Sequence, residues 1–190
     1  MNVWRLRIEL INDFHTSGVR TGSTIDMLRE KYIKDSCLKE RYIIPATHIK
    51  GVMRSEAKRI WGKREEIFRL FGPEEQEGKE FYEEPILKFT DARAKKAQVA
   101  ERARVRIDRN TGSHAERGLF SEKVICSGSV FVGFILSGHQ LNEEEERILK
   151  GSLTSASHYG LGKSRSSGLG QVKIELQPSS VQEVIKEMMR

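Results

Sequence analysis

The sequence predicts an α+β fold in which helices alternate with strands. Three observations support this class: a period-two apolar pattern near the N-terminus, a helical apolar pattern after Pro45, and a second period-two pattern near the C-terminus. A strongly basic stretch interrupts the order of elements near the middle of the chain. With 190 residues, the chain is long enough for one domain with its own core, so we expect a single domain over residues 1–190.

The first strand is predicted close to the N-terminus. Leu6, Ile8 and Leu10 alternate with charged residues, which is typical of a strand with one buried face. After this strand the apolar period lapses, and glycines, serines and charged residues follow one another. We therefore predict a loop insertion over residues 16–42, and long loops often carry function.

The first helix is predicted to follow Pro45. Apolar residues fall at helical spacing from Ile49 to Trp61, which indicates an amphipathic helix. Pro85 then introduces a short apolar run at residues 86–89, which predicts the second strand. The outer face of the helix is predicted to carry the basic residues Lys50, Arg54, Lys58 and Arg59.

A basic arm is predicted next in the chain. Residues 92–110 are rich in Arg and Lys and have little apolar support, so they cannot fold as core. We predict that they form one side of a protruding basic β-hairpin, a thumb inserted at about residues 92–123. Arg102, Arg104 and Arg106 recur on one side of this period-two element, and a plain solvated strand face is the alternative interpretation.

The C-terminal part of the chain completes the predicted core. Residues 124–136 are rich in Val, Ile and Phe and predict a buried strand. Asn142, with Glu145 three residues later, predicts a helix start, and residues 172–176 alternate as a last strand before a short helix capped by Ser180. The resulting order fits the ferredoxin-like βαββαβ plan that many RNA-binding modules share.

The charge of the chain favours a polyanionic partner. Lys and Arg number 33 against 27 Asp and Glu, giving a net charge of +6, although charge alone does not separate RNA from DNA or a membrane surface. No window approaches the roughly 18 apolar residues of a membrane span, and we expect a cytoplasmic protein without a membrane partner. The cysteines and histidines show none of the usual zinc-binding spacings, which argues against a preformed transition-metal site.

The segment from Tyr159 to Gly170 is the strongest candidate for binding a phosphate chain. It combines four glycines, two cations and three serines. Glycines let backbone N–H groups approach a phosphate, and the cations neutralise it. A Walker A motif would need glycine in place of Ser157, and GxGxxG would need glycine in place of Arg165, so a polynucleotide is favoured over a mononucleotide or a plain turn. The candidate residues are Gly160, Gly162, Lys163, Ser164 and Arg165.

Three segments match motifs of one known family in the same order. Residues 43–55 read IIPATHIKGVMRS and resemble the IPGSSLKG segment of the RAMP superfamily, with Ala46 replacing the usual glycine. Residues 160–170 resemble the glycine-rich C-terminal loop of that superfamily. Residues 104–120 resemble a segment of the backbone subunits of type III CRISPR effector complexes. Residues 14–18 depart from the family, which has more glycine at this place.

The resemblance implies an RNA-binding subunit of an antiviral ribonucleoprotein. Such subunits assemble as a filament along a guide RNA, and their thumbs kink the duplex of guide and target at regular intervals. The implied partners are guide RNA, complementary target RNA, further copies of the chain and other effector subunits, with base pairing supplying the sequence specificity. Outside the glycine-rich loop, the expected RNA contacts are His15, Arg20, Lys50, Arg54, Arg102, Arg104 and Arg106.

The resemblance also implies a metal-dependent endoribonuclease. Backbone subunits of the family cut target RNA with an aspartate in the loop after the first strand, and Asp26 stands at the matching place. Its rivals, Asp13 and Asp35, have plain structural interpretations. Asp26 could bind a divalent cation, Mg²⁺ or Mn²⁺, or position a ribose 2′-OH for attack on the adjacent phosphate. The sequence shows no second carboxylate nearby, which argues against a preformed two-metal site.

Two alternatives remain open from the sequence. One is a scaffold subunit of the same complex without cutting activity. The other is a RAMP endonuclease that processes precursor guide RNA, for which a histidine general base on a helix is expected; no histidine fills that place convincingly. His15 is a candidate for RNA contact or for simple packing, and His114 for base stacking or for solvent exposure.

Overall fold

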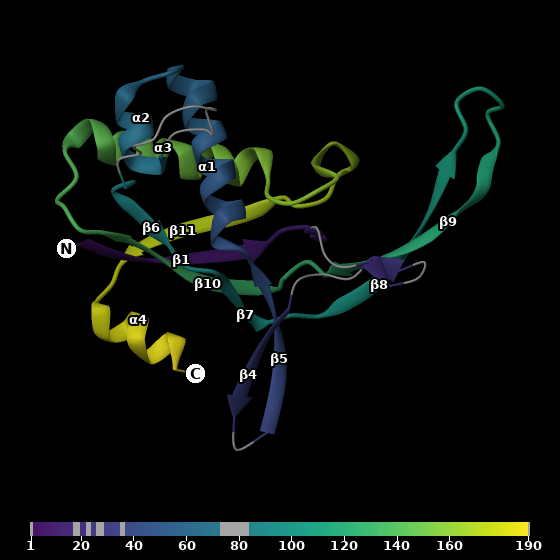
Figure 1. Cartoon of the computed structure of the whole chain (residues 1–190), viewed down its shortest axis with the longest axis horizontal. Coiled ribbons are helices and arrows are strands. Elements are labelled where there is room, and N and C mark those ends of the chain that lie inside the picture. The colour runs from purple at the N-terminus through teal and green to yellow at the C-terminus, as the bar shows by residue number, and fades with distance from the viewer. Residues whose placement is uncertain are drawn as a thin grey trace.

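The main antiparallel sheet is built around the strand predicted near the N-terminus. In the computed structural model shown in Figure 1, this strand has neighbours on both sides, and its residues Leu6, Ile8 and Leu10 are buried. The structure describes residues 2–16, 20–21, 24–25, 29–34, 37–72 and 84–189. The strand order is β11 (Val172–Pro178), β1 (Asn2–Leu10), β10 (Val130–Ser137), β7 (Ala92–Lys96), β5 (Cys37–Ile44) and β4 (Arg29–Lys34), and β6 (Leu87–Phe89) also pairs with β10.

Helices cover both faces of this sheet (Figure 1). On the face that carries the C-terminal helix, Val184 of that helix packs with Val3 and Phe134 of the sheet. The α+β class predicted from the sequence is thereby confirmed. Helices α1 (Ala46–Trp61), α2 (Glu65–Phe71) and α3 (Glu143–Tyr159) cover one face, and α4 (Val181–Met188) lies on the other.

The two predicted helix starts are confirmed by their hydrogen bonds. The Asn142 side chain accepts the Glu145 N–H at 2.8 Å, and the Glu145 carboxylate accepts the Asn142 N–H at 3.0 Å, which completes a capping box. The Ser180 hydroxyl accepts the Glu183 N–H at 3.2 Å at the start of α4. Local sequence therefore sets where both helices begin.

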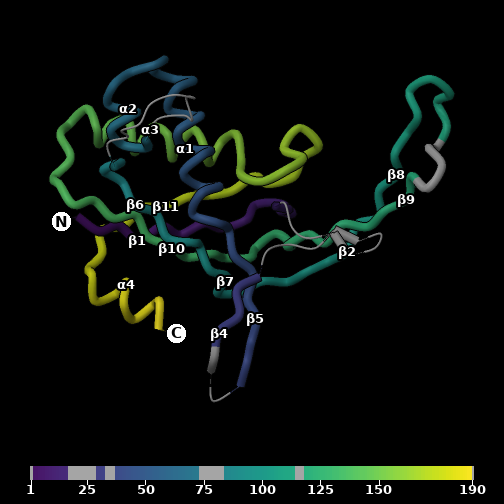
Figure 2. The backbone as a smooth tube through the Cα atoms, viewed as in Figure 1, coloured from purple at the N-terminus to yellow at the C-terminus, as the bar shows by residue number. Residues whose placement is uncertain are grey.

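The segment predicted as a long loop contains a β-hairpin. Strands β4 and β5 pair from Arg29 with Tyr42 to Lys34 with Cys37, so the prediction of a loop over residues 16–42 was wrong for this part. The hairpin extends away from the sheet (Figure 2), and an apolar alternation is absent because little of it is buried. At its base, the Glu30 carboxylate lies 3.0 Å from the Arg41 Nε and 2.9 Å from the Arg93 Nη2. Ion pairs therefore hold the base of this hairpin in place, whereas buried apolar side chains stabilise the main sheet.

A second hairpin projects from the body in a different direction from the first (Figure 1). It consists of β8 (Val99–Ile107) and β9 (His114–Ile125), which pair antiparallel and form a four-stranded sheet with β3 (Thr24–Ile25) and β2 (Arg20–Thr21). Its base is anchored by the buried Val124 and by a bridge between Phe14 and Ile125. Most of β8 is exposed.

Two predicted boundaries near this hairpin were wrong. The projecting part does not begin at residue 92, because β7 belongs to the main sheet and Ala92 is fully buried. Residues 124–136 are not one strand, because a turn that includes Gly128, at φ 75°, separates β9 from β10. Both errors arise where the chain passes from one sheet to the other while the amino-acid composition stays similar.

A candidate nucleic-acid interface at the glycine-rich loop

The glycine-rich loop after α3 is compact and packed on the end of β1. Its apolar residues Leu161 and Leu169 are buried, and the Leu161 N–H donates to the Gly170 carbonyl at 2.8 Å. Two further bonds of 2.8 Å tie the loop to the chain just after β1: the Gly170 N–H donates to the Asp13 carbonyl, and the Lys163 N–H donates to the His15 carbonyl. The loop is therefore a closed structure with a fixed base.

The glycines of this loop serve its internal closure. A Cβ atom on Gly170, at φ +79°, would lie 1.9 Å from the Leu161 carbonyl oxygen, and one on Gly162, at φ +85°, would lie 2.4 Å from the His15 carbonyl oxygen. The amides of Gly160 and Gly162 donate to Ala156 and His48, so they are not the phosphate donors that the sequence predicted. The loop does require glycine at these positions, but for close packing of its own backbone and not for the approach of a phosphate.

The groups that face outward lie at the tip of the loop. Lys163 and Arg165 are exposed. Ser164, at φ 59° and ψ 29°, turns the chain into the short 3-10 helix η1 (Arg165–Ser167). For the amides of Ser164, Arg165 and Ser166, the described part of the chain supplies no acceptor. Successive N–H groups at such a turn and two cations suit an anion.

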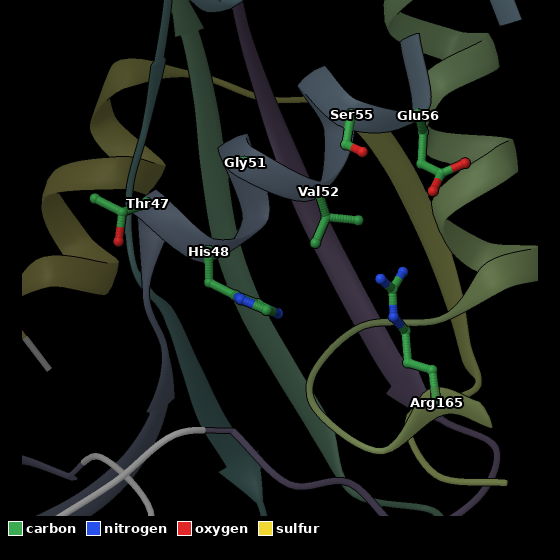
Figure 3. A pocket seen from close by; sticks show the side chains of 7 residues that line it. All are labelled: Thr47, His48, Gly51, Val52, Ser55, Glu56 and Arg165. Atoms are coloured by element: carbon green, nitrogen blue, oxygen red, sulfur yellow. The ribbon is translucent and has the colours of Figure 1, made fainter. Parts of the chain in front are cut away.

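A cleft of about 250 Å³ separates the loop from α1 (Figure 3). His48 from the helix and Arg165 from the loop point into it from opposite sides. The His48 Nε2 accepts the Gly162 N–H at 3.0 Å, and the Arg165 Nη1 donates to the Gly160 carbonyl at 3.3 Å. The lining consists of Thr47, His48, Gly51, Val52, Ser55, Glu56 and Arg165.

His48 is a site residue that the sequence reasoning missed. Burial, and then the nearby Arg165 charge, lower the pKa of His48 below its ordinary value. A neutral ring that accepts a hydrogen bond at Nε2 carries its proton on Nδ1. The contact joins residues 114 positions apart, and the only sequence signal was the place of His48 within the family-like segment at residues 43–55.

Acidification is expected to weaken the fold through His48. Because its pKa is lower in the folded than in the unfolded chain, its contribution is fully present above the unfolded value of about 6.5 and is lost as the pH falls through the folded pKa. The loss should reach about 1 kcal/mol, the worth of one hydrogen bond. Urea unfolding at about pH 7.5 and about pH 5.5 measures it. His48→Gln keeps an acceptor that does not titrate, so an equal loss in that variant contradicts the assignment.

The predicted basic face of α1 continues from this cleft into a second one. Lys50 lines a cleft of about 260 Å³ with Pro85 and Lys88, and Thr47 lines both clefts. Burial, and then the neighbouring Arg54, lower the pKa of Lys50. The Arg54 Nη1 lies 3.5 Å from the Gly72 carbonyl oxygen. Lys50 thus lies along the second cleft and Arg54 lies beside the end of α2, and Thr47 connects the two clefts.

His15 has a packing role in this structure. It is 2% exposed, and its Nδ1 lies 2.8 Å from the Lys123 carbonyl oxygen. Its side chain is not presented to a ligand, which favours the packing interpretation over the predicted RNA contact. Asp26 and Asp35 lie outside the described residues, as do the side chains of Arg20 and His114.

The three arginines of β8 are not equivalent. Arg104 forms an ion pair with Glu122 of β9, which is 5% exposed, and Arg102 lies 4.0 Å from the Asp13 carboxylate. Arg106 makes no ion pair within the described part of the chain. The period-two pattern predicted that all three arginines form one basic strand face. Because Glu122 of β9 neutralises Arg104, that arginine is not available to bind a ligand. The apolar residues that alternate with them, Val105 and Ile107, are about half exposed.

None of the helices in the described ranges is both long and apolar enough to cross a membrane. Among the same residues, no group of three or more His, Cys, Asp or Glu side chains is arranged to hold a metal ion.

Comparisons with known proteins agree with this architecture. A family model described as "RAMP superfamily" matches residues 8–173, while no curated protein matches. A chain of "Type III-B Cmr-beta Cryo-EM structure of the Apo state" is similar with a TM-score of 0.66 and 15% identity, over 96% of this chain and 98% of that one. A chain of "Type IV-B CRISPR Complex" gives 0.64 and 13%, over 94% and 92%. A chain of "Cryo-EM structure of the Type III-B Cmr-beta bound to cognate target RNA" gives 0.65 and 16%, over 94% and 61%.

Proposed function

The chain belongs to the RAMP superfamily, and from that membership we propose that it is a guide-RNA-binding backbone subunit of a type III CRISPR effector complex. The observation that carries the proposal is the loop tip, where Lys163 and Arg165 are exposed beside the cleft with His48. The similar folds belong to complexes described as CRISPR or Cmr-beta assemblies, and one of these is described as bound to cognate target RNA. The net charge of +6 supports a polyanionic partner.

The proposal extends to the finer architecture. A ferredoxin-like core would use β1, α1, the β6 and β7 segment, β10, α3 and β11, and the antiparallel order β11, β1, β10 and β7 supports it. We further propose a single RAMP domain over residues 1–190, with an insertion at 16–42 that contains the hairpin of β4 and β5, and with a thumb that begins after β7 and not at residue 92. The thumb corresponds to the projecting hairpin of β8 and β9.

The proposed path of the guide RNA runs over the loop and α1. One phosphate would bind at Lys163, Ser164 and Arg165, and the strand would continue toward Lys50 and Arg54. The exposed arginines of β8, Arg102 and Arg106, would contact the RNA held by a neighbouring copy. Head-to-tail copies related by a rotation that does not close would place these cations along one continuous strand. Other effector subunits would complete the ribonucleoprotein in the cytoplasm.

Cleavage of the paired target RNA is proposed to depend on Asp26. Its carboxylate would hold a divalent cation, Mg²⁺ or Mn²⁺, or position the ribose 2′-OH that attacks the adjacent phosphorus. The new bond to the 2′-oxygen forms as the bond to the 5′-oxygen breaks. The 2′-OH loses its proton and the leaving 5′-oxygen gains one, which gives a cyclic phosphate and a 5′-OH. Ile25, directly before Asp26, pairs with Glu122 at the base of the hairpin, which supports cutting close to the thumb.

Two alternative functions are also consistent with the structure. In the first, the chain is a scaffold of the same complex and cuts nothing. The second, a RAMP endonuclease that processes precursor guide RNA, gains support from His48, a histidine on a defined helix beside the glycine-rich loop. Cleavage of a precursor RNA by the isolated chain without added metal, lost in His48→Gln, would favour this last function over the backbone role.

Replacing both Lys163 and Arg165 by alanine is expected to weaken binding of single-stranded RNA by about 10- to 100-fold and to flatten its salt dependence. Each lost phosphate contact on a single strand lowers the slope of log K against log salt by about 0.7, so two contacts give about 1.4. Fluorescence anisotropy over a salt series measures both quantities.

A matched control removes two cations elsewhere. Arg147 and Lys150 lie on the exposed side of α3 and pair with Glu144 and Glu146, so their double alanine variant has the same change in formal charge. Its binding should stay within about 3-fold of the parent chain. An unaltered slope in the loop variant rules out phosphate contacts by Lys163 and Arg165 and refutes the proposed site.

A further inference from the structure

The last turn of α3 carries an exposed pair of aromatic rings. Tyr159 is 51% exposed, and the His158 ring meets it edge-on, with centroids 5.2 Å apart and an interplanar angle of 85°. Among the Phe, Trp and Tyr side chains that the structure describes, Tyr159 is the only exposed one. An exposed aromatic ring leaves apolar surface in water, which folding alone does not favour.

The Tyr159 ring is held from behind by a fixed cation. The Arg59 guanidinium lies 3.8 Å from the ring centroid, and it donates to the Glu56 carboxylate at 2.9 Å and to the Ser155 hydroxyl at 2.6 Å. Glu56 is only 6% exposed and also accepts the Ser155 hydroxyl at 2.6 Å. A buried carboxylate thus fixes the guanidinium, which in turn fixes the ring. A ligand that stacks on Tyr159 pays little to order it.

These rings are linked to the cleft that holds the loop cation by the backbone and by the anchor of Arg59. Gly160 follows Tyr159 directly, and its carbonyl accepts the Arg165 Nη1 at 3.3 Å. Glu56, which anchors Arg59, lines the same cleft as Arg165. The aromatic surface and the loop cation Arg165 are therefore connected through the backbone of Gly160, and the carboxylate that anchors Arg59 lines the cleft of Arg165.

We propose that Tyr159, with His158 beside it, is a stacking subsite for one nucleobase of the RNA strand whose phosphate binds at Lys163 and Arg165. The proposal rests on the RNA-binding function proposed above and adds the base to the phosphate. Every base offers a π-face, so the subsite accepts any sequence, as a guide of variable sequence requires. The Arg59 cation behind the ring strengthens the stack without reading a base edge.

The test compares single-stranded RNA with a matched oligomer of abasic ribose phosphate. Tyr159→Leu keeps an apolar side chain but removes the π-face, and it is expected to weaken binding of the RNA about 5- to 100-fold. Binding of the abasic oligomer should be unchanged, and so should the salt slope, because stacking releases no counterions. Tyr159→Phe keeps the ring and should restore binding to within about 3-fold.

The control is a second tyrosine with the same kind of contact. Arg41 lies 4.5 Å from the ring centroid of Tyr32 on the hairpin of β4 and β5, away from the loop, so Tyr32→Leu should leave RNA binding unchanged. Equal affinity of the parent chain and Tyr159→Leu, or an equal loss for the abasic oligomer, overturns the subsite. In that case an altered slope in the variant lacking Lys163 and Arg165 still supports the phosphate site. A parent chain that binds no RNA overturns both.

Discussion

Replacing Asp26 with alanine in the assembled ribonucleoprotein is expected to lower the rate of target-RNA cleavage about 100-fold or more while leaving RNA binding unchanged. A carboxylate that positions or activates the attacking 2′-OH contributes a factor of about 100 to 10,000. Binding should survive because base pairing and the loop cations hold the RNA. Cleavage of end-labelled complementary RNA with Mg²⁺ present measures the rate, and the product ends report the cyclic phosphate.

Asp13 provides the matched control for this substitution. Its side chain accepts the Ser127 N–H at 3.2 Å, a structural role that an amide oxygen can keep. Asp13→Asn should therefore cut at close to the parent rate. Unchanged cleavage in Asp26→Ala would reject the catalytic assignment, and absence of cleavage in the parent complex would favour the scaffold function.

Replacing Gly170 with alanine is expected to destabilise the fold by about 3 kcal/mol or more. The new Cβ would lie 1.9 Å from the Leu161 carbonyl oxygen, so the loop has to open or shift. Opening it also strains the hydrogen bond from Gly170 to the Asp13 carbonyl. The free energy of unfolding, measured by urea titration, reports the loss, and RNA affinity should fall with it.

Gly168→Ala separates the clash from the cost of the backbone angle. Gly168 has φ +80°, almost the same as Gly170, but a Cβ there meets nothing within 4 Å. Only the left-handed conformation is then penalised, by about 1 to 2 kcal/mol. If the two variants lose the same stability, close packing of the loop on itself is not what requires glycine at position 170.

The parts of the fold that depend on local sequence were predicted, and those that depend on distant partners were not. The alternation of Leu6, Ile8 and Leu10 and the capping residue Asn142 carry their own signals, because burial and capping act within a few residues. The hairpin of β4 and β5 gives no such signal. Glu30 at its base pairs with Arg93, 63 positions away, and no local pattern contains that partner.

The candidate site shows the same division. Composition identified the loop and its cations, since glycine, lysine and arginine are visible residue by residue. The partner of the Gly162 amide is His48, 114 positions away, and the anchor of Arg59 reaches Ser155 across two helices. On α1, Glu56 is buried, while Ile60, one of the apolar residues at helical spacing between Ile49 and Trp61, is 47% exposed. The sequence period could not foresee the burial of Glu56, because its carboxylate accepts a hydrogen bond from Ser155 of α3 in addition to the one from Arg59 of its own helix.

The hydrogen bonds that connect the glycine-rich loop to the chain after β1 should make tolerance to substitution differ between their donor and acceptor residues. Its acceptors are the main-chain carbonyl oxygens of Asp13 and His15, which every amino acid possesses. Its donor side includes Gly170, where any side chain would collide with Leu161. A random substitution library should therefore recover many residues at position 13 and almost none but glycine at position 170, although the two residues share one hydrogen bond.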